Sequence, residues 1–354
     1  MPTKKGNEPV RILFAGECTY PMYVQAFYHA ACRMDGVEAE IFDTALSSHG
    51  IDGSKLINQI QYHFAAGPVI RHINAALLEQ CRSAKYDIVF LYTCRIIYAK
   101  TVDKIRKTES YIAVYNNDDP FSPYQRRYFW RHYRDAIKYS DISYVYRLHN
   151  LEDSRREGAS RSEMLRAYYI KERNYHIPDP ALKDIPEVVY IGHLEDDGRL
   201  ETIKKIADNG ITIGLTASEC RRQGLYHTNI VEIEDAMEHY NMIINTAGIA
   251  IVFLSLLNRD TYTRRCFEIP ATKTMMLAPG TEDILTMYNE DEEIVCYRND
   301  DELLEKLKYY LTHQEERERI GEAGYRRLMR DGHEASDRVW QIILDYRRIG
   351  CMSG

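Results

Sequence analysis

The chain has 354 residues, 45% of them hydrophobic and 28% charged, which is typical of folded globular proteins and excludes a disordered chain. At about 150 residues per domain, this length predicts two domains. The net charge of −7 excludes a large sequence-independent contact with nucleic acid. The longest nearly unbroken apolar run, Ala247–Leu257, is too short for a transmembrane helix, which needs about 20 residues.

The eight cysteines are scattered along the chain without a C-x-x-C pair. This spacing favours reduced thiols over a disulfide framework or a zinc site. No apolar segment of signal-peptide length precedes Arg11. We therefore expect a cytoplasmic protein without a structural metal.

Short apolar runs alternate with helical patterns along the first half of the chain. The predicted strands are 11–15, 37–42, 87–92, 111–115 and 142–146, and the predicted helices between them are 22–34, 74–81, 101–107 and 123–139. Strands separated by helices predict a parallel sheet with helices on both faces.

The alternation stops at the proline-containing stretch 171–187, which we interpret as a linker, and then restarts. The predicted strands of the second half are 188–191, 211–214, 249–254, 275–278 and 293–297. Its predicted helices are 199–208, 234–241, one from about 269, one from about 299, one from 312 and one over 334–348; Thr312 and Glu315 have the spacing of a capping box. The sequence thus predicts an α/β protein with two Rossmann-like, doubly wound domains facing a central cleft. In open α/β sheets ligands bind beyond the carboxyl ends of the strands, so the loops there are the candidate sites.

The loop 258–267, NRDTYTRRCF, combines features that suit a phosphate group. Arg264 and Arg265 offer guanidinium groups that match phosphate oxygens in charge and geometry. A helix is expected to begin near Glu268, with Pro270 in its first turn, and a helix N-terminus favours anions. The two oxygens of Glu268 could accept hydrogen bonds from the two hydroxyls of a ribose, or the carboxylate could simply complement the helix dipole.

Long stretches of the second half resemble a known family. The stretch NRDTYTRRCFEIPATKTMMLAPGTED, the stretch EIVCYRNDDELLEKLKYYLTHQEERERIGEAGYRRL and the start VVYIGHLEDDGRLETIKKI are similar to CgeB-type (spore-maturation) glycosyltransferases, which are family 1-like. The first half matches more loosely, through NNDDP and YRLHNLED. The resemblance implies the GT-B fold, in which the second domain holds a nucleotide-sugar and the first holds the acceptor.

The resemblance also implies roles for individual residues. Glu268 would bind the ribose, and Arg265 with its neighbours would face the diphosphate. The helix 334–348 would cross back to pack on the first domain. The expected organisation is an acceptor-side domain over 1–170, a linker over 171–187, a nucleotide-sugar domain over 188–332 and a returning helix within 333–354.

Further donor contacts are expected around the same site. Asp260 lies eight residues before Glu268, where related retaining enzymes carry a second acid, so it is a candidate contact of the donor sugar. Gly192 and His193 directly follow the first strand of the second half, and Arg199 lies seven residues after Gly192. Related enzymes place a basic pair there, which makes His193 and Arg199 candidate phosphate contacts. A structural histidine and a solvated arginine are the alternatives.

Three residues of the first half are candidates for a catalytic base. Glu17 follows the first strand, Asp119 lies in the turn after the fourth, and His149 lies in the YRLHN segment. An inverting transfer needs such a group within hydrogen-bond reach of the attacking hydroxyl, whereas a retaining transfer may not. The pair Asp118–Asp119 could instead bind a metal or form a turn, but enzymes with the GT-B fold do not need a metal.

The sequence therefore predicts a glycosyltransferase without a cofactor, which moves a sugar from a UDP- or GDP-linked donor to an acceptor hydroxyl of a bacterial glycan, glycolipid or glycoprotein. Its location would be the cytoplasm, with the inner face of the membrane as an alternative within it. A nucleotide-sugar epimerase or hydrolase of the same fold, and a non-catalytic nucleotide-sugar-binding partner protein, are the alternatives. Base, sugar, acceptor, stereochemistry and oligomeric state stay open.

Overall fold

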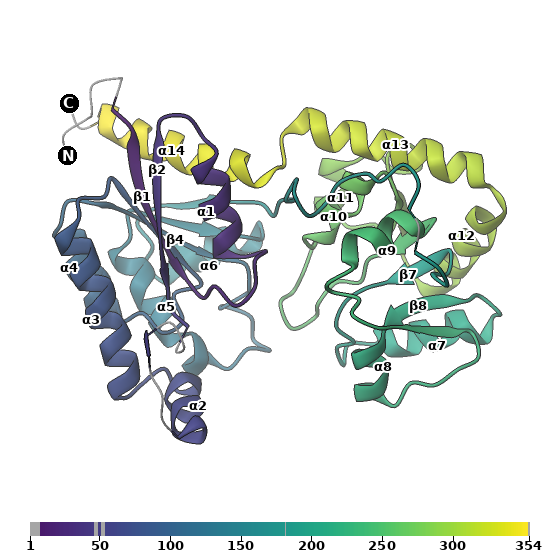
Figure 1. Cartoon of the computed structure of the whole chain (residues 1–354), viewed down its shortest axis with the longest axis horizontal. Helices are drawn as coiled ribbons and strands as arrows, with labels where there is room; N and C mark the ends of the chain where they lie inside the picture. Colours follow the sequence, from purple (N-terminus) through teal and green to yellow (C-terminus); the bar gives the residue numbers. More distant parts are fainter. Residues whose placement is uncertain (1–7, 46–48, 51–53, 181, 353–354) are drawn as a thin grey trace. The chain divides into compact units, whose positions relative to one another are not determined.

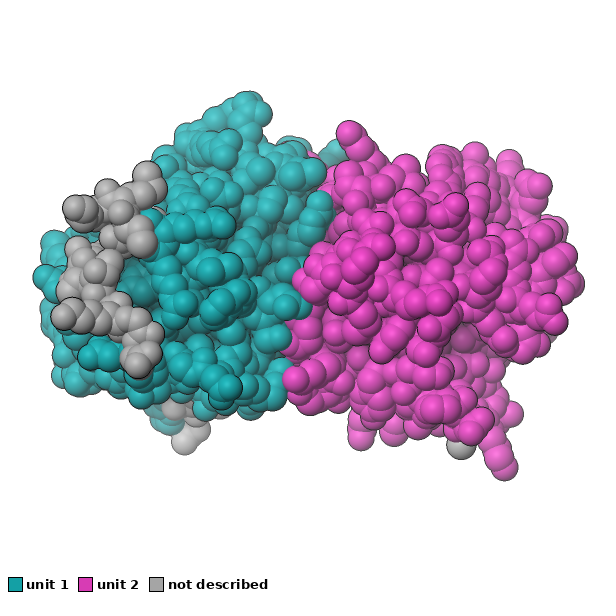
Figure 2. All heavy atoms as spheres, turned by 90° about the horizontal axis from the view of Figure 1, so that it is seen from above, with its two compact units in different colours: residues 1–166, 335–354 teal, residues 167–334 magenta. Residues whose placement is uncertain are grey.

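A computed structural model describes residues 8–45, 49–50, 54–180 and 182–352. The chain divides into two compact units, which Figure 2 draws in different colours: unit 1 contains residues 1–166 and 335–354, and unit 2 contains residues 167–334. Each unit is built around one six-stranded sheet whose strands are all paired in parallel.

Unit 1 has the strand order β2-β1-β3-β4-β5-β6. Its strands are β1 (Val10–Gly16), β2 (Val37–Asp43), β3 (Ile88–Tyr92), β4 (Tyr111–Asn116), β5 (Ile142–Val145) and β6 (Ser162–Met164). Its α-helices are α1 (Val24–Cys32), α2 (Lys55–His63), α3 (Pro68–Ser83), α4 (Ala99–Arg106), α5 (Arg131–Ala136), α6 (His149–Arg156) and α14 (Ala335–Met352). Strands β3 and β4 are buried along their whole length, as expected for parallel strands covered on both faces.

Unit 2 has the strand order β12-β11-β10-β7-β8-β9. Its strands are β7 (Val188–Tyr190), β8 (Ile213–Thr216), β9 (Ile230–Ile233), β10 (Ile249–Ile251), β11 (Met275–Pro279) and β12 (Val295–Tyr297). Its α-helices are α7 (Arg199–Asp208), α8 (Ala217–Gln223), α9 (Tyr240–Thr246), α10 (Arg265–Glu268), α11 (Glu282–Met287), α12 (Asp300–Thr312) and α13 (Gln314–Asp331). In chain order this is the Rossmann arrangement 3-2-1-4-5-6.

The last helix belongs to unit 1. Asp345 of α14 accepts a hydrogen bond from the Tyr144 hydroxyl at 2.8 Å, and the Gln341 amide donates to the Met164 carbonyl at 2.8 Å. The segment 171–187 belongs to unit 2, although we interpreted it as a linker. The Ile177 N–H donates to the Asn245 side chain of α9 at 2.7 Å, so this segment is tied to the unit's surface.

Several local predictions were wrong. The predicted helix 234–241 is a turn followed by α9, since Asp235 has φ 47°, outside the helical region. The predicted capping box at Thr312 does not form: its hydroxyl donates to the Tyr309 carbonyl at 2.9 Å, and α13 begins at Gln314 without a side-chain cap. The predicted helix 123–139 is two 3-10 turns around the short α5. Helix α2 and strand β6 were not predicted.

Candidate functional site

Strands β7 and β10 lie side by side at the centre of the sheet of unit 2, where the strand order reverses. The loops that leave their carboxyl ends diverge to opposite faces of the sheet, which opens the place where ligands bind in such folds. The loop after β7 contains Gly192 and His193 and leads to Arg199 at the start of α7, and the loop after β10 leads to Asp260 and Arg265. The fold therefore brings together most of the residues predicted to bind the donor.

Arg265 lies directly against the loop after β7. Its Nε donates to the Ile191 carbonyl at 2.9 Å, and its guanidinium carbon lies 5.4 Å from the centre of the Tyr190 ring. A Cβ atom on Gly192 would be only 2.1 Å from Nη2 of Arg265, so no larger residue fits at this position without displacing the guanidinium. These contacts orient the remaining guanidinium donors of Arg265, which can serve an anion.

Arg264, which directly precedes α10, forms an ion pair with Glu268, the last residue of this helix. Nε of Arg264 donates to Oε1 of Glu268 at 2.7 Å, and the Glu268 side chain is only 12% exposed. Both residues lie close to Arg265 in the sequence: Arg264 directly precedes it, and Glu268 follows it three residues later. A carboxylate held by one arginine and next to a second one is well placed to accept hydrogen bonds from hydroxyl groups.

The predicted helix N-terminus at Glu268 is wrong. Helix α10 has only four residues and ends at Glu268, and a 3-10 turn, Pro270–Thr272, follows it. The N–H groups of Glu268 and Ile269 donate to the carbonyls of Arg264 and Arg265 at 3.1 and 3.0 Å. Since these amides already have partners, the positive charge for an anion comes from side chains.

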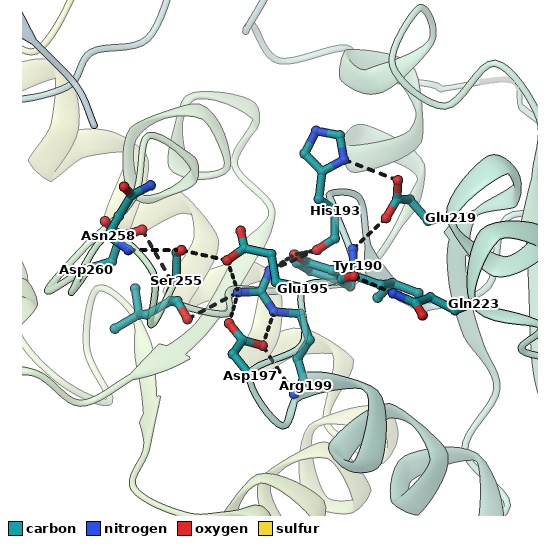
Figure 3. A network of polar contacts seen from close by, with 12 residues as sticks. Tyr190, His193, Glu195, Asp197, Arg199, Glu219, Gln223, Ser255, Asn258 and Asp260 are labelled. Carbon is teal, nitrogen blue, oxygen red and sulfur yellow. Dashed lines mark hydrogen bonds and ion pairs between the residues drawn. The ribbon is translucent and has the colours of Figure 1, made fainter. Parts of the chain in front are cut away.

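The buried side chain of Arg199 donates hydrogen bonds to the loop after β7 and to the loop after β10 (Figure 3). Its side chain is 4% exposed. Its Nη1 donates to the Tyr190 hydroxyl and to the His193 carbonyl, its Nε and Nη2 donate to Asp197, and Nη2 also reaches the Leu254 carbonyl. Because all five N–H donors have protein acceptors, the predicted contact of Arg199 with phosphate is corrected to a positioning role.

His193 projects from the loop after β7 and is held at one nitrogen (Figure 3). Its side chain is 83% exposed, and its Nδ1 lies 3.2 Å from Oε1 of Glu219. Partial burial alone would raise the pKa of Glu219, but hydrogen bonds from Arg222, the Leu194 N–H and His193 outweigh it and lower this pKa to about 2. Glu219 therefore stays ionised. It contacts His193 at Nδ1, so Nε2 of His193 is the ring nitrogen that can contact a ligand.

Asp260 closes the turn that follows β10. Its N–H donates to the Ser255 carbonyl at 2.9 Å, and its carboxylate accepts from the Ser255 N–H at 3.3 Å. The Ser255 hydroxyl donates to Glu195 at 2.6 Å, so Asp260 belongs to the network around Arg199 in Figure 3. This turn stabilisation gives Asp260 a structural role; a contact with a donor sugar stays a prediction.

Sequence reasoning missed the residues that support this site. Tyr190, Glu195 and Glu219 orient Arg265, Arg199 and His193. Glu195 follows His193 in the motif GHLEDDGR, and an acid so close to a basic pair could have indicated an ion-pair network. Glu219 lies 26 residues from His193, and no local pattern links the two.

Unit 1 has a pocket at its own switch point, between β1 and β3. It measures about 190 Å³ and is lined by Ala15, Glu17, Tyr20, Tyr23, Thr44, Tyr62, Leu91, Tyr92, Thr93, Cys94, Arg95, Ile96, Ile97, Asn117 and Asp118. The Glu17 carboxylate accepts hydrogen bonds from the Thr19 hydroxyl at 2.8 Å and from the Tyr62 hydroxyl. Thr93 and Cys94 form the wall with φ of 65° and 51°, a strained conformation that often marks functional sites.

The structure brings Asp119 and His149 together; neither lines this pocket, although Asp118, which precedes Asp119, does. Asp119 is completely buried, and its Oδ1 accepts from the Phe121 N–H at 3.0 Å and from the Asn150 amide at 2.9 Å. Nε2 of His149 lies 3.4 Å from Oδ2 of Asp119, and the His149 side chain is 32% exposed. A buried carboxylate that orients a partly exposed imidazole is the arrangement of a general base and its orienting group.

Within the described residues, no group of three or more His, Cys, Asp or Glu side chains is arranged to hold a metal ion. None of the helices in that same part of the chain is long and apolar enough to span a membrane.

Residues 201–344 match a protein-family model described as glycosyl transferase-like. No sequence among the curated proteins matches the chain. Solved structures show the fold. The chain is similar to sucrose-phosphate synthase from Thermosynechococcus elongatus, with TM-score 0.68 and 13% identity over 98% of this chain and 100% of that one.

The descriptions of two further similar structures mention a nucleotide or a nucleotide-sugar. HepE from Anabaena, in complex with UDP and glucose, has TM-score 0.64 and 11% identity over 95% of this chain and 99% of its own. A putative UDP-N-acetylglucosamine 2-epimerase from Listeria monocytogenes has TM-score 0.55 and 11% identity over 95% of both chains. The protein thus has the GT-B fold, and part of its second half is similar to a glycosyl transferase-like family model.

Proposed function

We propose that this protein is a glycosyltransferase that moves a sugar from a UDP- or GDP-linked donor to an acceptor hydroxyl of a bacterial glycan, glycolipid or glycoprotein. The finer resemblance to CgeB-type enzymes and a cytoplasmic location are part of this proposal. Support comes from the glycosyltransferase-like domain over residues 201–344 and from HepE, a protein of the same fold described in complex with UDP and glucose.

The observation that carries the proposal is the position of Arg265. Its guanidinium lies against Gly192 at the switch point of unit 2, with the Arg264–Glu268 pair in the same segment. In transfer, the acceptor oxygen forms a bond to the anomeric carbon while the bond from that carbon to the diphosphate oxygen breaks. Arg265 would neutralise the charge that develops on the leaving diphosphate, and Glu268 would hold the ribose hydroxyls.

The proton of the acceptor hydroxyl needs a recipient in an inverting transfer. We assign it to His149, which Asp119 orients at 3.4 Å, because this imidazole is partly exposed whereas Asp119 is buried. Glu17 is the rival base, since it is exposed beside the pocket of unit 1, where it would otherwise bind the acceptor.

The experiment is a thermal-shift screen of the purified protein against UDP-, GDP-, dTDP- and CMP-sugars, followed by product analysis with the donor that binds. Transfer to added acceptors is the expected result. Failure of every nucleotide-sugar to raise Tm would reject the proposal, since a ligand at 100 times its Kd stabilises a protein by about 2.7 kcal/mol.

A second candidate function is a nucleotide-sugar epimerase or hydrolase, favoured by the similarity to the Listeria 2-epimerase. Such an enzyme would convert the donor with no acceptor present, so donor turnover without acceptor discriminates the two. A non-catalytic nucleotide-sugar-binding partner protein would bind the donor and show no turnover at all.

A further inference from the structure

Helix α2 exposes an apolar face that no part of unit 1 covers in the described residues. Leu56, Ile57, Ile60 and Phe64, which follows the helix directly, are 66%, 56%, 49% and 50% exposed. Their spacing of three and four residues places these side chains on one side of the helix. In Figure 1, α2 lies at the end of unit 1 opposite α14.

A second segment, 121–131, packs beside this helix. The Tyr128 ring stacks on Phe64 with ring centres 6.1 Å apart, and its hydroxyl lies 3.1 Å from Nε2 of His63. Arg131 donates to the Phe64 and Ala65 carbonyls. We call α2 with Phe64 and the segment 121–131 the α2 face.

The charge of the α2 face is opposite to that of the whole protein. Its residues, 55–64 and 121–131, contain four of the 46 Lys and Arg residues and none of the 53 Asp and Glu residues, although the chain has a net charge of −7. From outside these segments, Glu157 forms ion pairs with Arg134 and, at 3.6 Å, with Arg127. Arg126 and Arg131 have no carboxylate partner within 4 Å among the described residues.

The face also contains aromatic side chains at its edge. Tyr124 is 57% exposed, and Arg95 lies over the rings of Tyr62 and Phe129 at 4.2 and 4.4 Å. Exposed aliphatic residues and tyrosines beside arginines that lack a carboxylate partner, here Arg126 and Arg131, are the composition that enters the interface of an anionic bilayer. The apolar side chains reach the acyl boundary and the arginines meet the phosphates.

We propose that the α2 face docks on an anionic lipid membrane. Tyr62 of the α2 face lines the pocket of unit 1, and so does Arg95, which lies over the Tyr62 and Phe129 rings of this face. Docking would therefore place the mouth of that pocket at the bilayer surface, within reach of an acceptor held in the membrane. The docking itself does not depend on the proposed transferase activity.

The test is co-sedimentation of the full-length protein with vesicles of phosphatidylcholine alone or with about one third phosphatidylglycerol. We expect binding only to the anionic vesicles, weakened at 0.5 M NaCl because salt screens the arginines. Arg126→Glu should reduce the partition coefficient at least fivefold, since each arginine near an anionic surface contributes about that factor. The double variant Leu56→Gln/Ile60→Gln should reduce it about tenfold or more.

Matched controls are Arg326→Glu on α13 and Met237→Gln, which are exposed positions in unit 2. Both should bind as the wild type does. Circular dichroism and light scattering accompany every variant. Equal binding to neutral vesicles, no binding to anionic vesicles, or equal losses in the controls would overturn the proposal. Binding that survives the apolar substitutions would indicate a general polyanion-binding surface. A wild-type dimer that Leu56→Gln/Ile60→Gln converts to a monomer would assign the face to a second copy of the chain. Both outcomes would also overturn the proposal.

Discussion

Nη2 of Arg265 occupies the space that a side chain at position 192 would need, since a Cβ on Gly192 would be 2.1 Å away. The loop after β7 and the segment after β10 are far apart in the sequence. They meet at the switch point because the Arg265 guanidinium fills the space beside Gly192, which has no side chain. The Gly192 backbone has no positive φ, so close approach rather than backbone conformation explains the glycine.

Gly192→Ala should displace Arg265 and weaken donor binding by about tenfold or more, with a loss of stability of about 1–3 kcal/mol from overpacking. Calorimetric titration with the donor and chemical denaturation measure the two effects. Gly210→Ala is the control: its φ of 79° makes the substitution strained, but the space around it is open. It should lose stability without losing donor affinity, and similar donor affinities in both variants would contradict the role of Gly192.

Arg265→Ala should lower kcat/KM about 100- to 1000-fold, as the loss of a group that stabilises a developing negative charge does. Arg265→Lys should recover only part of this loss because an ammonium lacks the planar fork. Steady-state kinetics with varied donor is the measurement. Wild-type values for Arg265→Ala would reject the contact with the diphosphate.

His149→Ala should lower kcat by about 100-fold or more, the usual contribution of a general base. Asp119→Asn should lower it as well and change the pH profile of kcat, because the buried carboxylate fixes the imidazole. If Glu17→Gln abolishes transfer while His149→Ala does not, the base is Glu17.

Glu219→Gln should lower the free energy of unfolding by about 2 kcal/mol near pH 7, the usual contribution of hydrogen bonds to a charged group. The pKa of Glu219 is lowered to about 2 in the folded protein, so its contribution is fully present above its ordinary value of 4.5 and is lost as the pH falls towards 2. Denaturation of the two proteins from pH 7 to pH 3 measures this difference, which should shrink below about pH 4.5. A constant difference would contradict the ionised state.

Addition of EDTA should leave the transfer activity unchanged, because we expect the arginines of unit 2 to supply the charge that a metal supplies elsewhere. Assays with EDTA, and with EDTA followed by Mn²⁺, measure this. Activity that is lost with EDTA and restored by Mn²⁺ would reject a metal-free reaction.

Much of the fold could be predicted from the sequence because buried parallel strands are short apolar runs. The five strands predicted for the first half and the helix 199–208 lie where the pattern places them. Two wrong predictions have local causes. The predicted helix 234–241 is interrupted by the positive φ of Asp235, and the Thr312 hydroxyl donates to the Tyr309 carbonyl rather than capping α13. Neither choice is visible in hydrophobic periodicity.

The candidate site could be predicted in position but not in detail. Arg265 and Gly192 follow adjacent strand ends, which the sequence identifies. The sequence predicts Arg199 as a phosphate contact because an arginine lies there shortly after the first strand of the second half. Its five donors are instead taken by acceptors such as Asp197 and the Leu254 carbonyl, 55 residues away, which only the folded chain brings together.

The most direct test of the donor site is calorimetric titration of UDP and GDP into the wild type, Glu268→Ala and the control Glu322→Ala, which removes a carboxylate of α13 that pairs with Lys273. We predict that the nucleotide that binds the wild type has a Kd at least tenfold higher with Glu268→Ala, as the loss of a charged hydrogen bond implies, and the same Kd with Glu322→Ala. Equal Kd values for wild type and Glu268→Ala would contradict the assignment of this loop to the donor nucleotide.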